Sequence, residues 1–393
     1  MTTFPMRRQR PLDPPDEFGV LREQGSVHRM TYPDGHEGWL VTGYGAARAI
    51  LADNRFSNRM ELQHQAIPSR AAIAEKFKKQ MPDSKPQPGM FLRMDPPDHT
   101  RFRKLLTGQF TVRRMKGLEP RIAEITEERL DFMTAPADLV KDFALPIPSL
   151  VICELLGVPY EDRETFQRDS ATLLSFDGEA DTLIAAYQDL AGYLYGLIAK
   201  KRAQPDEALL SGLLDLEDDE LLGVAFLLLI AGHETTANML GLGTYALLTN
   251  PGQLALMRDD PSAVDNGVEE LLRYLTIIHA GPIRAALEDV EIEGHRIKAG
   301  ESVTISLSSA NRDPAHFEAP DRLDLTRATA GHLTFGHGIH QCLGQQLARI
   351  EMRIAFPALL RRFPGLRLAC APSEVPMRSD MAIYGVHRLP VTW

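Results

Sequence analysis

The segment Phe335-Gly-His-Gly-Ile-His-Gln-Cys-Leu-Gly344 combines the residue types that are most able to do chemistry. Its thiol, Cys342, stands at the start of a helical pattern over residues 343–363. Free N–H groups and the helix dipole at such a position stabilise a thiolate. Other residues of the segment would let a large flat ligand approach, cover one of its faces or donate to its anions: Gly338, Gly344, Phe335 and His340. A thiolate ligand to haem iron has these requirements; a buried structural thiol is the alternative.

A second polar group interrupts the longest apolar stretch of the chain. Ala231-Gly-His-Glu-Thr-Thr236 places a glycine, an acid and two threonines inside a helical pattern that we expect over residues 218–248. These residues cost helix propensity and desolvation energy in a buried helix, so packing alone does not explain them. A threonine hydroxyl that leaves the i−4 bonding pattern opens a local groove. Glu234 and Thr235 are therefore candidate catalytic residues.

Basic and hydrogen-bonding side chains occur where they could bind anions. The run Asp95-Pro-Pro-Asp-His99-Thr-Arg-Phe-Arg103 predicts a helix that is capped by Asp95 and begins with proline. His99 and Arg103 are four residues apart and share a face of that helix. With Arg284 and His340 they make four donors or cations, which would suit two buried carboxylates. Ordinary surface charge is the alternative for each of them.

Three motifs together resemble one known family. The first, F-x-x-G-x-H-x-C-x-G around Cys342, is similar to the haem-binding signature of the cytochrome P450 monooxygenases. Glu270-Leu-Leu-Arg273 resembles the family's E-x-x-R, although alone it would indicate only a helix salt bridge worth about 0.2–0.5 kcal/mol. The third motif, on the central helix, resembles A-G-x-[DE]-T-[TS]. The resemblance covers essentially the whole chain and is strongest to soluble actinobacterial members.

This resemblance implies a role for each candidate residue. Cys342 would be the axial ligand of haem b, and Glu234 with Thr235 would help to deliver protons to dioxygen, the co-substrate. A structural ion cluster would hold the thiolate loop. Its members would be Glu270, Arg273 and Arg322. The remaining residues that would contact the cofactor or its propionates are His99, Arg103, Arg284, Phe335, Gly338, His340 and Gly344.

The resemblance also implies a reaction and its partners. One oxygen atom would enter a C–H bond of a hydrophobic small molecule, a secondary metabolite or xenobiotic, and the other would leave as water. The chain has no flavin or iron–sulfur motif, so electrons would come from a ferredoxin and an NAD(P)H-dependent ferredoxin reductase. Basic residues that would face the ferredoxin are Lys104, Arg113, Arg114 and Lys116, with Arg361 and Arg362 as second choices.

We expect an apolar substrate pocket under a roof of two segments, residues 61–90 and residues 173–187. By position in the family, the residues that would line the pocket are Met90, Phe91, Leu227, Ile230, Ala231, Ala280, Ile283 and Ile383. Each of them could equally be ordinary core. Two other functions remain open on the same scaffold. One is a peroxygenase driven by hydrogen peroxide, which would not need the Glu234–Thr235 pair, and the other is a haem-binding sensor without turnover.

The surrounding pattern predicts the elements that position these residues. Two alternating stretches, residues 27–32 and 38–42, flank the turn Pro33-Asp34-Gly35 and predict a hairpin. The pattern is mainly helical from Asp95 to about residue 280. Short strands follow at residues 290–292, 295–297 and 302–307, and the last residues also look like strands. We expect a mainly α fold with small β regions, a single triangular domain over residues 1–393, with haem between the central helix and the Cys342 helix.

Composition supports an ordinary globular protein. Of 393 residues, 44% are hydrophobic and 24% are charged, and 43 basic against 53 acidic residues leave a net charge of −10. That charge argues against a broad grip on nucleic acid or anionic lipid. Three scattered cysteines cannot form a disulfide framework. The first residues lack a signal peptide's apolar core, and the longest apolar run is too short for a membrane span. We expect a cytoplasmic monomer.

Overall fold

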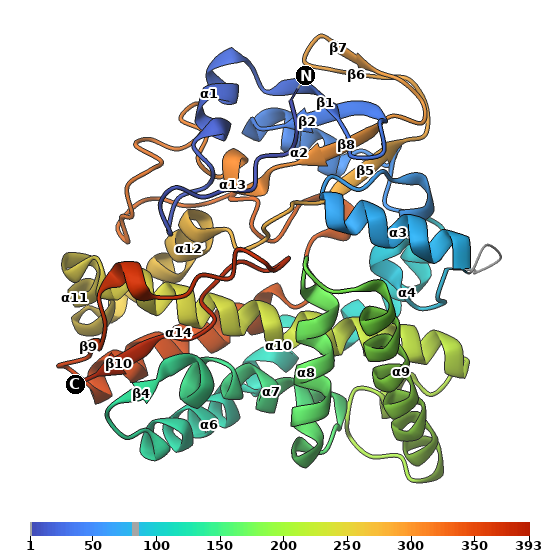
Figure 1. The fold of residues 1–393 in the computed structure, drawn as a ribbon. Coiled ribbons are helices and arrows are strands. Elements are labelled where there is room, and N and C mark those ends of the chain that lie inside the picture. Colours follow the sequence, from blue (N-terminus) through green and yellow to red (C-terminus); the bar gives the residue numbers. More distant parts are fainter. Residues whose placement is uncertain (1, 81–85) are drawn as a thin grey trace.

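The computed structural model describes residues 2–80 and 86–393 and consists of a helical part and a smaller β part (Figure 1). The helices are α1 Glu17–Gln24, α2 Tyr44–Ala52, α3 Pro68–Gln80, α4 Asp98–Gln109, α5 Val112–Gly117, α6 Glu119–Phe132, α7 Pro146–Leu156, α8 Arg163–Leu174, α9 Ala180–Ala203, α10 Asp218–Leu248, α11 Pro251–Asp259, α12 Val264–Leu275, α13 Leu307–Ala310 and α14 Gln345–Arg362. Two single turns, η2 Phe91–Arg93 and η7 Gly338–His340, lie near the candidate site. The mainly helical fold with small sheets is confirmed.

Helix α10 runs through the middle of the helical part and packs against α7, α9 and α14 (Figure 1). Its first turn is stabilised by a capping box, in which Glu217 and Glu220 each accept from the other's backbone N–H. It is the one helix of the described residues that is long and apolar enough to cross a membrane, yet 67% of its most apolar window is buried inside the protein. Burial by the surrounding helices explains its apolar composition.

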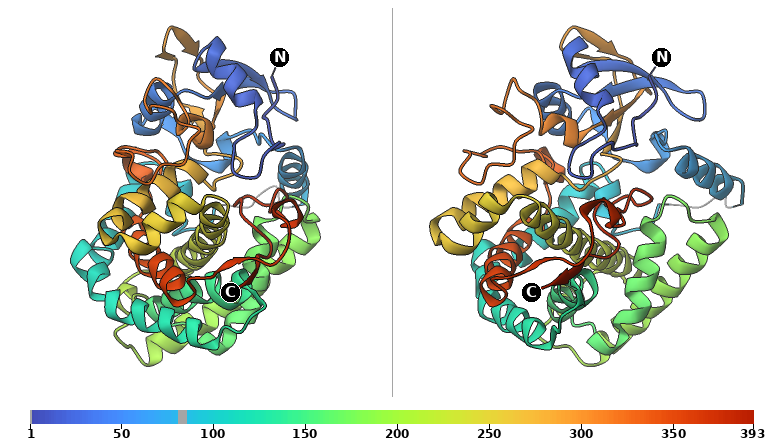
Figure 2. Two further views of the ribbon diagram at one scale, coloured as in Figure 1. Left: turned by 90° about the vertical axis from the view of Figure 1, so that its left-hand side faces the viewer. Right: turned by 60° about the vertical axis from the view of Figure 1, so that its left-hand side comes forward.

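The β part contains a five-stranded sheet in the order β1-β2-β8-β5-β3. The strands of the molecule are β1 Val27–Thr31, β2 Glu37–Val41, β3 Phe56–Ser57, β4 Ala137–Asp138, β5 Ile283–Ala286, β6 Val290–Ile292, β7 His295–Ile297, β8 Ser302–Ile305, β9 Arg367–Leu368 and β10 Pro390–Thr392. β1 and β2 form the expected hairpin, with Val27 opposite Val41. The hairpin pairs with β8, whose four residues are all buried. In both views of Figure 2 this part lies at one end of the broader helical part.

A C-terminal segment, residues 377–386, ties the two parts together. Its Ala382 N–H donates to Leu174 O at the end of α8 (2.9 Å), and Phe176 N–H donates to Asp380 O (2.8 Å). On its other side, Tyr384 N–H donates to Ile277 O (2.7 Å). The segment therefore connects the start of the second expected roof region to the strand-like stretch between α12 and β5.

Several expected boundaries were wrong. Helix α4 starts at Asp98, not after Asp95, because the Asp95 carboxylate instead accepts from the Ser57 hydroxyl (2.5 Å) and the Asn58 N–H (2.9 Å). The expected strand over residues 302–307 ends at Ile305, and α13 follows. The roof segment over residues 61–90, expected to be a long surface loop with a short helix, contains the 13-residue helix α3. The part of that loop around Pro82 lies outside the described residues.

Candidate functional site

The Cys342 loop is held by backbone contacts on both sides. The Cys342 N–H donates to Phe335 O (2.8 Å), which closes the loop, and the N–H groups of Gly344 and Gln345 point at the sulfur. Gly338 has φ +74°, and a Cβ there would lie 2.4 Å from Leu51 O of α2. Only glycine fits so close to that backbone. Gly338 therefore serves packing against α2, whereas the sequence suggested room for a ligand.

The Cys342 side chain is exposed, yet protein surrounds it closely enough that burial raises the pKa of its thiol. The accessible surface of Cys342 therefore faces an interior space and not bulk solvent. The N–H groups of Gly344 and Gln345, with Arg103 and Arg349, oppose the rise but do not reverse it. The backbone N–H groups thus act in the expected direction, but desolvation dominates. A metal bound to the sulfur would supply the missing stabilisation.

The polar group on α10 also has accessible surface in an otherwise buried helix. Ala231 is exposed, and Thr235, one turn later, is half-buried. The Thr235 hydroxyl donates to Ala231 O (2.8 Å), and α10 stays helical across the motif. The expected opening of the i−4 pattern at Thr235 is therefore absent. For the hydroxyl to donate to anything else, it must first leave Ala231 O.

Glu234 points away from that accessible strip. Glu234 is 3% exposed. Its carboxylate accepts a hydrogen bond from Arg378 Nη2 (3.0 Å), which lies on the C-terminal segment. Asn238 Nδ2 lies 3.4 Å from the same oxygen. His233 Nε2 lies 4.0 Å from the other oxygen and has no hydrogen-bond partner in the part of the chain that the structure describes. Arg378 was missed by the sequence analysis, because 144 residues separate it from Glu234 and no local pattern marks it.

The predicted anion-binding residues converge around α4, β5 and the Cys342 loop. His99 is 2% exposed, and neither of its ring nitrogens has a hydrogen-bond partner among residues 2–80 and 86–393. The His99 and His340 ring centroids lie 4.2 Å apart. Burial, then His99 and nearby arginines, lower the pKa of His340 to about 3, so the chain itself makes His340 a neutral donor. Arg103 is close enough to Cys342 for each to shift the other's pKa.

Arg284 has an unexpected neighbour. Its Nη1 donates to Asn58 Oδ1 (2.6 Å), and the Asn58 amide in turn donates to Leu92 O. This bridge holds η2 beside β5 and brings Arg93 near Arg284, so that Arg93, after burial, contributes to lowering the pKa of Arg284 to about 10. Arg93 was also missed, because it lies outside the motif that begins at Asp95.

The predicted pocket residues divide by burial. Phe91 and Ile383 are buried, and the others retain accessible surface: Met90, Leu227, Ile230, Ala231, Ala280 and Ile283. Met90 and Phe91 lie close to α10, because Gly223 has no side chain and lets the preceding backbone approach the helix. A Cβ at Gly223 would lie only 1.9 Å from Pro88 O. Ala280 and Ile283 instead pack against a cluster that includes Phe176. The residues thus come from the start of η2, from α10, from the stretch that leads into β5 and, for Ile383, from the C-terminal segment.

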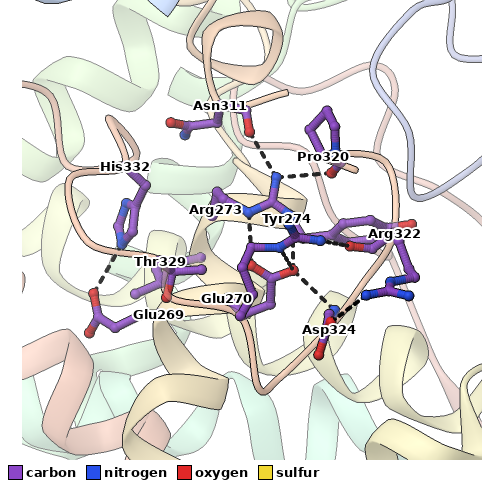
Figure 3. Close-up of polar contacts among 12 residues, drawn as sticks. Glu269, Glu270, Arg273, Tyr274, Asn311, Pro320, Arg322, Asp324, Thr329 and His332 are labelled. Carbon is purple, nitrogen blue, oxygen red and sulfur yellow. Dashed lines mark hydrogen bonds and ion pairs between the residues drawn. The ribbon is translucent and has the colours of Figure 1, made fainter. Parts of the chain in front are cut away.

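The Glu270 cluster is an ion network around one fully buried pair, and Figure 3 draws its contacts. Glu270 and Arg273 are both 0% exposed and form a two-pronged contact, in which Arg273 Nε and Nη2 each lie 2.8 Å from a carboxylate oxygen. Arg273 Nη1 also donates to Asn311 O and Pro320 O. Asp324 N–H donates to Glu270 (3.0 Å). The network therefore fixes the chain between α13 and the Cys342 loop onto α12.

The third ionic member is Arg327, not Arg322. Arg327 Nε lies 3.2 Å from Glu270 Oε1, whereas the Arg322 side chain is 71% exposed and pairs with Asp324 (Figure 3). Arg322 contributes only its backbone carbonyl, which accepts from Arg327. The prediction of Arg322 was wrong because the spacing within this loop does not follow a helix or strand period, so sequence position does not indicate which arginine turns inward.

The neighbouring carboxylate, Glu269, holds the other flank of the loop. It accepts from His332 Nε2 (3.0 Å), just before the loop, and from Arg349 Nε (2.6 Å), on α14 just after it. Burial alone would raise the pKa of Glu269, but these hydrogen bonds outweigh it and lower the pKa to about 2. Two adjacent residues of α12 therefore anchor both the approach to Cys342 and the helix that follows.

With this geometry in view, the chain can be compared with known proteins. The Cytochrome P450 family model matches residues 182–380. Cytochrome P450 105C1 of Streptomyces sp. is 50% identical over 398 residues, which cover 100% of this chain and 98% of the relative. The chain belongs to the cytochrome P450 family. Within that family it is a bacterial CYP105 protein, and like the other CYP105 proteins it is a monooxygenase.

Solved structures of P450 proteins agree closely with the fold. CYP105P1 in complex with filipin I has a TM-score of 0.91 and 46% identity, with 100% of this chain and 98% of that chain covered. The mycinamicin VIII C21 methyl hydroxylase MycCI from Micromonospora griseorubida, bound to mycinamicin VIII, has a TM-score of 0.92 and 36% identity, with both chains covered completely.

Membership implies a haem-thiolate cofactor, and the residues of this P450 fit one. Cys342 offers a soft sulfur ligand with accessible surface inside the protein. His99 has two buried nitrogens without a protein partner, as expected of a residue that donates to a ligand's anion. Arg103 and Arg284 add buried positive charge beside it. The donor set therefore suits an iron porphyrin with acidic side chains.

Arg327→Gln and Arg322→Gln test the ion cluster with one matched substitution. We expect Arg327→Gln to lower the free energy of unfolding by about 3–5 kcal/mol, since the buried Glu270 carboxylate would lose one of its two cationic partners. Arg322→Gln should cost less than about 1 kcal/mol, because its ion pair is exposed. Denaturant unfolding of the haem-loaded proteins measures both. Equal effects would contradict the assignment of Arg327.

Proposed function

We propose that this P450 binds haem b through Cys342 and hydroxylates a hydrophobic small molecule with electrons from an external ferredoxin. The observation that carries the proposal is Cys342 itself, a thiol that has accessible surface inside the protein and receives two backbone N–H groups. When bound, the haem would supply the activation of dioxygen. His99, Arg103, Arg284 and His340 would bind its propionates, and Phe335, Gly338 and Gly344 would shape the loop beneath it.

Glu234 and Thr235 are proposed to handle protons. The Thr235 hydroxyl can pass a proton only by exchanging its bond to Ala231 O for one to a bound molecule, which a rotation about χ1 achieves. Glu234 would receive protons from the side of Arg378, whose guanidinium keeps the carboxylate oriented. The alternative peroxygenase function is disfavoured by this pair, because peroxide brings its own protons.

Hydrophobic substrates are proposed from the apolar residues with accessible surface and from the relatives. CYP105P1 has been solved with filipin I and MycCI with mycinamicin VIII. Leu227, Ile230 and Ala231 would form one wall along α10, and Met90 with Ala280 and Ile283 would oppose them. α3 and the start of α9 would form the roof, joined by an ion pair between Lys76 and Asp181 (3.0 Å).

We further propose that residues 1–393 act as one domain, as a monomer in the cytoplasm. The sequence contains no recognisable flavin or iron–sulfur motif. Ferredoxin would therefore dock on the side of Cys342, where α5 packs against α14. Basic Lys104, Arg113 and Lys116 are exposed there, with exposed Leu105 and Val112 between them.

Two of the other expected basic residues suit docking less well. Arg362 pairs with Asp131 and Glu127. Arg114, on α5, donates a hydrogen bond to Gln109 at the end of α4.

Cys342→Ser should abolish the thiolate signature. Wild-type protein, reduced and exposed to carbon monoxide, should show the strongly red-shifted absorption band of a thiolate-bound haem, and the variant should not. Cys153→Ser and Cys370→Ser are matched controls that should keep the band. A sensor without turnover would share the band but would not consume NAD(P)H with substrate, ferredoxin and reductase present. Retention of the band in Cys342→Ser would disprove the ligand assignment.

Thr235→Ala should separate electron use from product. The variant keeps the haem site and should still bind substrate and consume NAD(P)H, but it should release more hydrogen peroxide and form less hydroxylated product, by about tenfold or more. The ratio of product to NAD(P)H measures this. Thr244→Ala, a buried i−4-bonded threonine further along α10, is the control and should leave that ratio unchanged. An unchanged ratio in Thr235→Ala would remove Thr235 from the mechanism.

Charge reversal tests the electron partner. Arg113→Glu with Lys116→Glu should slow reduction by ferredoxin several-fold and weaken its dependence on salt, because exposed attraction is screened beyond about 8–10 Å at physiological ionic strength. Turnover driven by peroxide should not change. Lys78→Glu with Lys79→Glu, on α3, changes the net charge equally and should have no effect on reduction. Faster turnover with peroxide than with ferredoxin in wild type would instead favour the peroxygenase.

A further inference from the structure

Three arginines near the candidate site have no carboxylate partner. Arg93 and Arg103 make no side-chain hydrogen bond or ion pair within residues 2–80 and 86–393, and Arg284 bonds only to neutral oxygens of Asn58 and Ile283. Burial lowers the pKa of all three guanidinium groups. Buried cations without anions are costly to keep. We therefore expect each of them to face an anion that the chain does not supply.

The cofactor accounts for two of these three charges. The proposed haem carries two propionates, and His99 and His340 can add hydrogen bonds to them. Arg103 lies beside His99 on α4, and Arg284 lies near His340. One positive charge is left over. Arg93 lies near Arg284, but it is the one of the three that also lies near Arg70 of α3, so we assign the remaining charge to Arg93.

The contacts of Arg93's neighbours place it between the cofactor region and the roof. On one side, Asn58 links Leu92 to Arg284. On the other side is Arg70 of α3, whose pKa is lowered by burial and then by the nearby charge of Arg93. Arg70 Nη2 donates to Leu173 O (2.8 Å), and its guanidinium lies 5.8 Å from the Phe176 ring centre. Arg93 is exposed although protein surrounds it, so it faces interior space.

We propose that Arg93, assisted by Arg70, binds a carboxylate of the substrate, so that this enzyme prefers hydrophobic carboxylic acids to their neutral analogues. A guanidinium matches a carboxylate with two parallel hydrogen bonds, which fixes orientation as well as affinity. Met90 and Phe91, in the same turn as Arg93, provide the apolar surface for the rest of the molecule. The proposal rests on the proposed function and names the class of its substrate.

Matched pairs of ligands test the proposal on the haem-loaded enzyme. The probes are lauric acid with lauramide, and dehydroabietic acid with dehydroabietinol, each titrated by the change in the haem absorption spectrum. Wild type should bind each acid about tenfold more tightly than its neutral analogue, as expected for charge-assisted hydrogen bonds. Added salt should reduce that preference. Equal affinity within both pairs, or no binding of either acid, would overturn the proposal.

Arg93→Gln is the decisive variant. It should weaken acid binding about tenfold, leave binding of the neutral analogues within about twofold, and leave haem content and the carbon monoxide band unchanged. Arg93→Lys should recover part of the preference for acids. Arg59→Gln is the matched control, because Arg59 already pairs with Asp95 and Glu61, and it should behave as wild type.

Each other outcome identifies its own cause. Loss of haem from Arg93→Gln with the acid preference intact would make Arg93 a propionate partner and refute its role toward substrate. Equal weakening of acid and neutral ligand would mean a general packing effect and would also refute it. Absence of the thiolate band from wild type would instead contradict the proposed function, so the two failures are distinguishable.

Discussion

The structure depends on two adjacent carboxylates in the middle of α12, of which Glu270 is fully buried and Glu269 is half-buried. Glu270 fixes the chain that approaches the Cys342 loop, and Glu269 fixes His332 and Arg349 on either side of the loop. Buried ions are tolerated only when every charge is met, and here Arg273 and Arg327 meet Glu270 while Arg349 meets Glu269. An irregular loop gains in this way the rigidity that a helix or strand would otherwise provide.

This rigidity matters because the Cys342 thiolate is unfavourable without a metal. Burial raises the pKa of Cys342, and two backbone N–H groups with two arginines do not reverse that effect. The loop must therefore present the sulfur in one position and let the cofactor complete its electrostatics. The same division holds for the arginines at the other edge of the site, whose charges the chain leaves unpaired. The protein thus fixes the positions of the sulfur and of the guanidinium groups, and bound molecules supply the opposite charges.

The sequence was a good guide wherever a function depends on residues that are close together in the chain. The Cys342 segment, the Glu234–Thr235 pair and the Glu270–Arg273 pair each lie within one turn or one loop, so their spacing could be matched to the motifs of the family. It was a poor guide to partners that meet through folding. Arg378 reaches Glu234 across 144 residues, and Arg327 replaces Arg322 within a loop that has no period.

Boundaries failed for a related reason. The Asp95-Pro pair has the form of a helix start, yet the carboxylate is used by Ser57 and Asn58, so that α4 begins at Asp98. Local propensity was outweighed by a contact that only the tertiary structure creates. The overall fold class did not depend on such details, because it follows from the long periodic segments such as α10.

The C-terminal segment gives the enzyme a mechanical property. Residues 377–386 carry Arg378, which holds Glu234, and the same ten residues are hydrogen-bonded to the stretch between α8 and α9 through Phe176 and Leu174. A bulky substrate that displaced the stretch between α8 and α9 would therefore also displace the C-terminal segment and, with it, Arg378. The size of a bound molecule and the orientation of the Glu234 carboxylate are mechanically coupled through these ten residues.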